Sequence, residues 1–340
     1  MATPIRLSSL MGIAKSSEAG FRPARRHTDL RIVLLWSSAQ MHIPDNFLSP
    51  PVWAALDVVS IPIVGFMAKR ASHDLEEARV PLLGVMGAFV FAAQMINFPV
   101  GVGTSGHLVG GALLACTLGA APAVLVMTAI IAMQAFVFQD GGVLALGANV
   151  FNMAVAGVLT GYLPFKLWGA GPRRKAAIFV GAFLSVLVSA SLALSELLIS
   201  GVRMPQPVIF ISLGLFTVSA LIEGAITISV IQVLEKLNPR FVQRPEAPSG
   251  RAIAVLGVGA IVAGTAGFLL ASSAPDGIMR LGQDLGLATK TVMHAPLADY
   301  AVGSFESAWL RRATAGLAGL VLIYGICAAA GRWMGRQRSA

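Results

Sequence analysis

The feature that most constrains the fold is a succession of long apolar segments separated by short polar loops. Hydrophobic residues make up 56% of the 340 residues, and charged residues make up only 12%. Soluble domains carry roughly 25% charged residues. An α-helix crosses a bilayer with about 20 mostly apolar residues. We therefore predict an all-α, polytopic integral membrane protein.

The chain contains nine apolar segments, and we expect each of them to be a helix. About seven form the predicted main bundle within residues 41–236, and two lie in a C-terminal segment, 251–340. The stretch 237–250 between these domains is rich in proline and charge, which is typical of a linker. The expected helices are 53–68, 80–97, 108–118, 122–138, 143–163, 176–199, 208–234, 252–270 and 313–330.

Residues 1–40 do not fit this pattern. They contain six lysines and arginines against two acidic residues. Their apolar run, residues 32–36, is too short to span a bilayer and is a poor secretory signal. We interpret this extension as disordered, as cleaved, or as an overcalled gene start, so that Met41 is the expected start of the working protein.

The distribution of lysine and arginine predicts how the chain crosses the membrane. If Met41 lies outside, most of the basic loop residues fall inside, as the positive-inside rule requires. The linker and the carboxyl end are then cytoplasmic, and His42, His107 and the pair Gln139-Asp140 share the external side. The net charge of +9 comes from these loops and from residues 1–40. We therefore expect membrane lipid, and no nucleic acid, around the protein.

Sequence signatures of common enzyme classes are absent. The chain has no His-Glu-x-x-His, no Gly-x-Ser-x-Gly and no Gly-x-x-x-x-Gly-Lys phosphate loop. Its two cysteines, Cys116 and Cys327, both lie in apolar runs, where a small buried side chain is the expected role. We predict that the protein is not an enzyme and that any ATP hydrolysis comes from a partner.

A histidine directly follows Met41 where the membrane domain begins. A histidine in the second position can offer a transition metal its imidazole, its own deprotonated amide nitrogen and the preceding terminal amine. This set of nitrogens closes two fused chelate rings and favours square-planar Ni(II) or Cu(II). The alternative is that His42 is an interfacial histidine in a loop before the first helix.

Two further polar sites lie on the same predicted side. His107 follows a turn-rich stretch, residues 98–106, whose glycines allow the backbone to approach a ligand closely. Irregular backbone at membrane depth is tolerated only where it faces protein or a cavity. A histidine that caps or packs against a helix is the alternative. Gln139 and Asp140 are either site residues or polar residues at the tip of a loop.

Three polar residues lie within apolar segments. Asn149 and Asn152 are nearly one turn apart, so they can hydrogen-bond the returning glycine loop or each other, and we favour this structural role. Glu223 is an acid inside a predicted span and functional by default, although a pair with Thr227 is the alternative. An intramembrane enzyme that uses Glu223 with Asp140 is disfavoured, because the two are predicted at opposite ends of the membrane.

Three ordered motifs resemble one family of membrane proteins. They are Met41-His42-Ile43-Pro44-Asp45, then Gly103-Thr104-Ser105-Gly106-His107, then Gln139-Asp140-Gly141-Gly142 followed by Asn149 and Asn152. They resemble the CbiM/NikM family, the substrate-binding (S) components of energy-coupling factor (ECF) ABC transporters for cobalt and nickel. The C-terminal segment, with Pro275-Asp276-Gly277, resembles the small NikN/CbiN component fused to it.

The resemblance implies a set of metal ligands. These are the amine of Met41, the amide and imidazole nitrogens of His42, and the imidazole of His107. One departure is Asn46, which stands where the family usually has glycine. We expect the surrounding loops to support the site through Gly103, Thr104, Ser105, Gly106, Gln139, Asp140, Asn149 and Asn152.

The resemblance also implies a function and partners. It indicates uptake of a divalent transition metal across the bacterial inner membrane, with Ni(II) favoured by the Ile-Pro-Asp form of the opening motif and Co(II) next. The metal is cargo, and no permanently bound cofactor is expected. The partners are a T-type transmembrane protein and two ABC ATPase subunits. A channel or secondary carrier that works without partners is the main alternative.

Overall fold

The computed structural model describes residues 42–74, 79–101, 103–238, 241–242, 250–272 and 274–339. The predictions for residues 1–40 and for Met41 fall outside this part of the chain, as does most of the linker, 237–250. All the described residues belong to one unit, which begins at Ser37.

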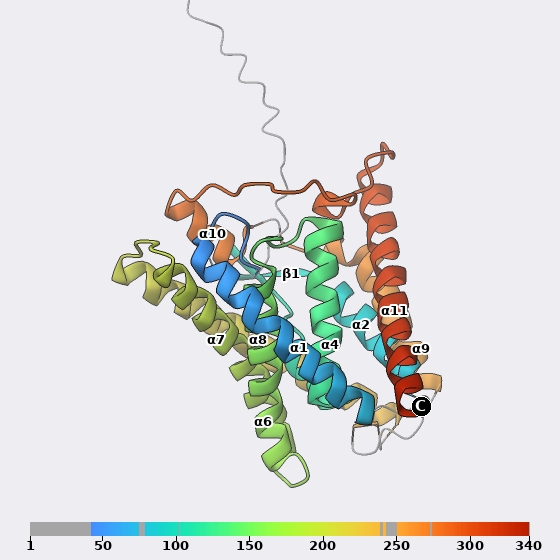
Figure 1. The fold of residues 1–340 in the computed structure, drawn as a ribbon. Helices are drawn as coiled ribbons and strands as arrows, with labels where there is room; N and C mark the ends of the chain where they lie inside the picture. The colour runs from blue at the N-terminus through green and yellow to red at the C-terminus, as the bar shows by residue number, and fades with distance from the viewer. Residues whose placement is uncertain are drawn as a thin grey trace, which may run out of the picture. The chain divides into compact units, whose positions relative to one another are not determined.

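The described chain is built almost entirely from helices (Figure 1). Seven of them are long and apolar enough to cross a membrane, and one more apolar helix is shorter. The prediction of an all-α, polytopic membrane protein is therefore confirmed. The helices are α1 (Pro50–Asp74), α2 (Val80–Gln94), α3 (Gly111–Leu118), α4 (Ala120–Met133), α5 (Leu146–Asn149), α6 (Val158–Trp168), α7 (Arg174–Ile199), α8 (Gln206–Leu237), α9 (Gly250–Ala266), α10 (Gly277–Asp284) and α11 (Ala308–Ser339).

Two of the spans contain π-helical segments, where the helix takes an extra residue into its turn. The segment η2 (Gln134–Phe138) continues α4, and η3 (Val150–Gly157) joins α5 to α6. They flank the loop that carries Gln139 and Asp140. π-Helical turns are frequent at functional sites.

The third expected span is shorter than the sequence predicts. The turn-rich stretch before it forms a β-hairpin from β1 (Asn97–Gly101) and β2 (Thr104–His107), with Asn97 opposite His107, and the helix starts at Gly111 instead of 108. Gly110, at the N-cap of α3, has a φ of 78°, which glycine adopts without strain. α3 is therefore only 8 residues long, too short to cross a bilayer by itself.

The C-terminal segment packs against the rest of the bundle. Its helices α9 and α11 both contact α2 and contact each other. Between them, the chain from α10 to α11 runs along the end of the bundle at which α1 begins (Figure 1). α10 starts at Asp276, whose buried side chain accepts a hydrogen bond from the Met279 amide at 2.7 Å and so caps the helix.

Helix pairs approach closely where glycines face each other, as expected for spans that pack through small residues. A Cβ atom on Gly181 of α7 would overlap the carbonyl oxygen of Gly161 in α6. Gly316 of α11 has the same relation to Gly264 of α9. At these two crossings, α6 with α7 and α9 with α11, the helix backbones are therefore in direct contact.

We predict that Gly181→Ala destabilises the protein by about 1–3 kcal/mol, because the added methyl group must push α6 away from α7. The matched control is Gly214→Ala in α8, where a Cβ atom meets nothing within 4 Å. Melting temperatures of the two variants in the same detergent check this. Equal melting temperatures for both variants would contradict the proposed close packing.

Candidate metal site

The structure brings together two histidines that are 65 positions apart in the sequence. His42 comes from the loop before α1, and His107 comes from the end of β2. Their ring centroids lie 6.1 Å apart, and their planes differ by 13°. Both side chains are buried, with exposures of 1% and 2%. The predicted convergence of these two residues is therefore present in the fold.

Asn149 holds the loop that carries His42. Its side-chain oxygen accepts a hydrogen bond from the Ile43 amide at 2.7 Å, and its side-chain nitrogen donates to the Ile43 carbonyl at 3.1 Å. The Gly142 amide donates to the same carbonyl at 2.9 Å. The sequence predicted that Asn149 bonds the glycine loop or Asn152. Instead, it fixes the residue next to His42.

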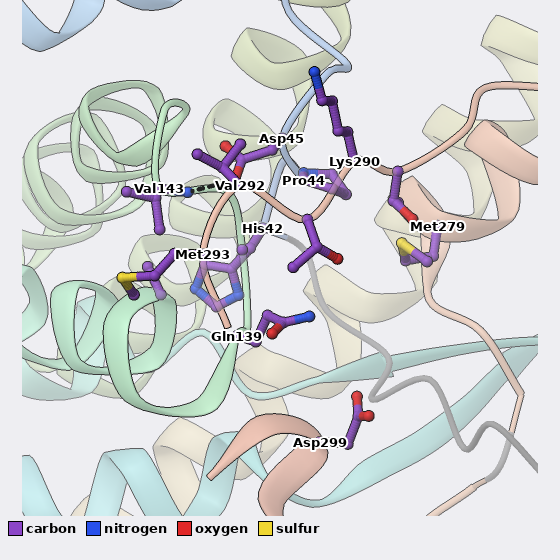
Figure 2. A pocket seen from close by; sticks show the side chains of 14 residues that line it. His42, Pro44, Asp45, Gln139, Val143, Met279, Lys290, Val292, Met293 and Asp299 are labelled. Carbon is purple, nitrogen blue, oxygen red and sulfur yellow. Dashed lines mark hydrogen bonds between the residues drawn. The ribbon is translucent and has the colours of Figure 1, made fainter. Parts of the chain in front are cut away.

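Asp45 and Asn46 hold the same loop from its other side. The Asp45 carboxylate accepts a hydrogen bond from the Val143 amide at 3.1 Å (Figure 2). It also accepts one from the Leu144 amide at 2.8 Å. Asn46 has a φ of 75°, a conformation that glycine adopts freely and asparagine tolerates. This explains how asparagine can stand where the resembling family usually has glycine. Sequence reasoning did not identify Asp45 as a residue that positions the loop.

The loop is also tied to the first span. The Gly147 amide donates to the Asp57 carboxylate at 2.6 Å, and the Ser60 hydroxyl donates to the Gly147 carbonyl at 2.8 Å. Asp57 and Ser60 belong to α1, and Gly147 lies in α5, two residues before Asn149. These bonds connect α1 to the residue that holds Ile43.

His107 is fixed by its own main chain. Its Nδ1 atom lies 2.8 Å from the Leu108 carbonyl oxygen. A ring nitrogen that faces a carbonyl must carry the hydrogen, so the lone pair resides on Nε2. This is the tautomer that metal-binding histidines adopt when their second nitrogen is hydrogen-bonded.

Glu223 anchors the residues that follow His107. Its two carboxylate oxygens accept hydrogen bonds from the amides of Val109 and Gly110, each at 2.8 Å. The prediction that Glu223 and Asp140 lie at opposite ends of the membrane is therefore wrong, since Glu223 binds the segment that carries His107. It is held by these backbone amides, and not by the Thr227 hydroxyl that was the predicted alternative partner.

Asp140 stands beside His42. One of its oxygens, Oδ1, lies 2.9 Å from Nδ1 of His42, without the alignment of a hydrogen bond. The other, Oδ2, accepts a hydrogen bond from the Tyr300 hydroxyl. Tyr300 belongs to the C-terminal segment, and no motif or spacing in the sequence links it to this loop. Gln139, with a φ of 57°, accepts a long hydrogen bond from the Ala295 amide at 3.4 Å.

The glycine-rich hairpin supports the site less directly. Ser105 donates its amide to the Pro275 carbonyl at 2.8 Å and its hydroxyl to the Ala274 carbonyl at 2.7 Å. Its neighbours Thr104 and Gly106 are also buried, and Gly103 takes a φ of 69° at the turn. Ser105 therefore joins the hairpin to the C-terminal segment.

Asn152, predicted to support the site, points toward α7 and away from the two histidines. Its side-chain nitrogen donates to Glu196 of α7 at 2.8 Å. The hydroxyl of Ser189, also in α7, donates to the Asn152 carbonyl at 2.9 Å. Asn152 therefore joins η3 to α7, and it makes no described contact with either histidine.

A cavity of about 150 Å³ opens next to His42. One wall comes from the main bundle, with Asp45, Gln139 and Val143, and the other comes from residues 289–293 and Asp299 of the C-terminal segment. Figure 2 shows the imidazole of His42 among these side chains. The cavity therefore lies directly beside the buried ring of His42.

Side chains alone do not complete a metal site in the described part of the chain. No three His, Cys, Asp or Glu side chains there converge on one point. A cation shared by His42 and His107 therefore needs main-chain or terminal nitrogens as further donors. His42 is suited to this, because its Nδ1 and its own amide nitrogen can close a six-membered chelate ring.

Burial keeps His107 neutral. Loss of solvent, followed by the neighbouring charge on His42, lowers the pKa of His107 from its ordinary 6.5 to about 4. A neutral imidazole is the form that binds a metal ion. The ring is therefore ready to act as a ligand throughout the neutral and mildly acidic range.

This pKa predicts an acid-sensitive fold. Below pH 6.5 the unfolded chain takes up a proton at His107, whereas the folded chain takes it up only near pH 4. Stability should therefore fall by up to about 3 kcal/mol as the pH falls across this interval. Melting curves in detergent at pH 7 and pH 4.5 measure the loss, which His107→Gln should reduce and His73→Gln, at an exposed position, should not. An equal loss in both variants would exclude His107 as its source.

Comparisons with known proteins agree with this organisation. The family model CbiM, described as "Cobalt uptake substrate-specific transmembrane region", matches residues 42–241. A protein of Archaeoglobus fulgidus that is provisionally named a fused nickel transport protein, NikMN, is 31% identical over 291 residues, covering 83% of this chain and 95% of its own length. The fused nickel transport protein NikMN of Rhodobacter capsulatus is 27% identical, with the same coverage of both chains.

Two solved structures share the fold. A truncated transition metal transporter has a TM-score of 0.53 and 29% identity, covering 58% of this chain and 99% of its own. Another transition metal transporter has a TM-score of 0.52 and 30% identity, covering 58% and 93%. The relatives confirm the prediction of a transport protein and not an enzyme, and their fused names confirm the predicted C-terminal component. Because the family model spans more than half of the sequence, this protein belongs to the CbiM family.

Proposed function

We propose that the protein captures Ni(II) outside the membrane as the substrate-binding component of an ECF-type ABC transporter. The observation that carries this proposal is the buried, nearly parallel pair of His42 and His107, at 6.1 Å between ring centroids. With metal–nitrogen bonds of about 2 Å, two imidazoles on one cation have ring centres roughly 4.5–6.5 Å apart. In the planar set proposed below the two imidazoles are adjacent, at the lower end of this range, so the rings would approach each other by roughly 1.5 Å on sharing an ion.

The remaining donors come from the start of the working chain. The amide nitrogen of His42 and the amine of Met41 would complete a planar set of four nitrogens with the two imidazoles. Such a set favours Ni(II) over Co(II). The Ile-Pro-Asp opening motif and the fused nickel transport relatives support the same preference. Cobalt remains the second candidate, since the family is described by cobalt uptake.

Energy for transport is proposed to come from partners. The sequence has no phosphate-binding loop, so a T-type membrane protein and two ABC ATPases would drive delivery of the ion. The positive-inside distribution supports an inner-membrane orientation with Met41 outside and the carboxyl end in the cytoplasm. A channel or secondary carrier would need none of these partners.

The metal site predicts that His42→Ala and His107→Ala each abolish Ni(II) binding. Each substitution removes one of the two imidazole donors of the proposed site. Isothermal titration calorimetry of the purified protein measures the loss, with His73→Ala at an exposed position as the matched control. Tight binding by either of the first two variants would refute the site.

The amine donor is tested separately on the same preparation. Intact mass and N-terminal sequencing of the protein extracted from membranes should show a chain that begins at Met41. A chain that begins at Met1 and still binds Ni(II) through both histidines would rule out the terminal amine while leaving the imidazole ligands in place.

The partner requirement predicts that vesicles containing this protein alone accumulate no Ni(II). Uptake should appear when the T-type protein and both ATPases are present with ATP, and it should disappear without ATP. Radioactive nickel measures the accumulation. ATP-independent uptake by the protein alone would instead identify a channel or carrier.

A further inference from the structure

The C-terminal segment places one side chain, Tyr300, against the candidate metal site. Its hydroxyl donates a hydrogen bond to Oδ2 of Asp140. The other oxygen of Asp140 lies 2.9 Å from Nδ1 of His42. Only Asp140 therefore separates Tyr300 from Nδ1 of His42, the imidazole nitrogen of the proposed chelate ring.

The same hydroxyl also leads to the second histidine. It accepts a hydrogen bond from the Gln134 side chain at 3.3 Å, and that nitrogen also donates to Gln94 at 3.0 Å. Gln94 in turn donates to the Val109 carbonyl at 2.8 Å, two residues after His107. A continuous chain of hydrogen bonds thus runs from Asp140 through Tyr300, Gln134 and Gln94 to the main chain just after His107, and Tyr300 is its only member from the C-terminal segment.

Tyr300 is held firmly in an unusual conformation. It has a φ of 52°, and the preceding Asp299 has a φ of 55°, values that bulky side chains rarely adopt. The Tyr300 ring stacks on Phe138, with centroids 4.6 Å apart and planes 17° apart, and it also contacts Phe91. Backbone strain of this kind persists where the surroundings impose it, and it concentrates at functional sites.

The hydroxyl remains a hydrogen-bond donor. Burial, together with the negative charge of Asp140, raises the pKa of Tyr300 well above its ordinary value. The proton therefore stays on the Tyr300 oxygen, and the carboxylate of Asp140 stays the acceptor.

We propose that Tyr300 is a positioning residue for metal capture. It holds Asp140 so that a negative charge faces the cation beside the His42 nitrogen, and it links that charge to the main chain that follows His107. The C-terminal segment thereby sets the affinity of a site whose ligands all lie in the main bundle. This inference rests on the proposed function.

The competing explanation is purely structural. The Tyr300 ring fills space between Phe91 and Phe138, and phenylalanine would fill the same space. A structural role therefore predicts that removal of the hydroxyl leaves metal binding unchanged. The positioning role predicts a loss of affinity in a protein that remains folded.

The test uses the full chain, purified in detergent and titrated with Ni(II) alone. Tyr300→Phe should weaken Ni(II) binding by roughly 10- to 100-fold, the usual effect of removing a group that orients a metal ligand. The visible absorption of the bound Ni(II) should shift as well. Tyr324→Phe, in α11, is the matched control and should bind as the parent does.

A double-mutant cycle tests whether Tyr300 acts on metal binding through Asp140. Asp140→Asn should weaken binding to a similar degree, and Tyr300→Phe should add little in that background, because the two residues act as one unit. Wild-type affinity and an unshifted spectrum in Tyr300→Phe would overturn the proposal. If that variant does not fold, Asp140→Asn decides alone, and wild-type affinity in it overturns the proposal equally.

The outcome is separable from failure of the proposed function. Loss of binding in His42→Ala and His107→Ala, with no change in Tyr300→Phe, would reject only the role of Tyr300. Retained binding in both histidine variants would reject the site itself, and the role of Tyr300 with it.

Discussion

Buried main-chain groups that need hydrogen-bond partners are the constraint on which this structure depends. The loops that carry His42 and His107 are irregular, and they lie among apolar helices where water cannot satisfy their amides. Asp45, Asn149 and Glu223 each bind two main-chain groups of these loops or of their neighbours. The hydrogen bonds of these three side chains thus hold in place the two loops that carry His42 and His107.

Much of this arrangement could be predicted from the sequence. The apolar segments and the basic loops indicated a polytopic helical protein with His42 and His107 on one side, and the structure brings these two residues together. The donor chemistry of a histidine in the second position was visible in the residue order alone. These features depend on the order of neighbouring residues and on the spacing of apolar segments, both of which can be read from a sequence.

Other features depend on contacts between distant segments. Tyr300 lies 160 positions from Asp140, and nothing in its surroundings indicates that partner. Asn152 shares a motif with Asn149 but faces Glu196 of α7, because the π-helical η3 begins between them and changes the direction of the side chains. The third helix starts at Gly111 instead of 108, because Gly110 takes a left-handed backbone conformation that the sequence does not specify.

The bonds from α1 to Gly147 have a mechanical consequence. Few side chains of α1 are fully buried in the protein, and many of them are exposed. Its Asp57 and Ser60 are nevertheless tied to Gly147, and through the same short helix to Asn149 and the main chain beside His42. If a neighbouring molecule tilted α1, these hydrogen bonds would transmit the movement to the loop that carries His42.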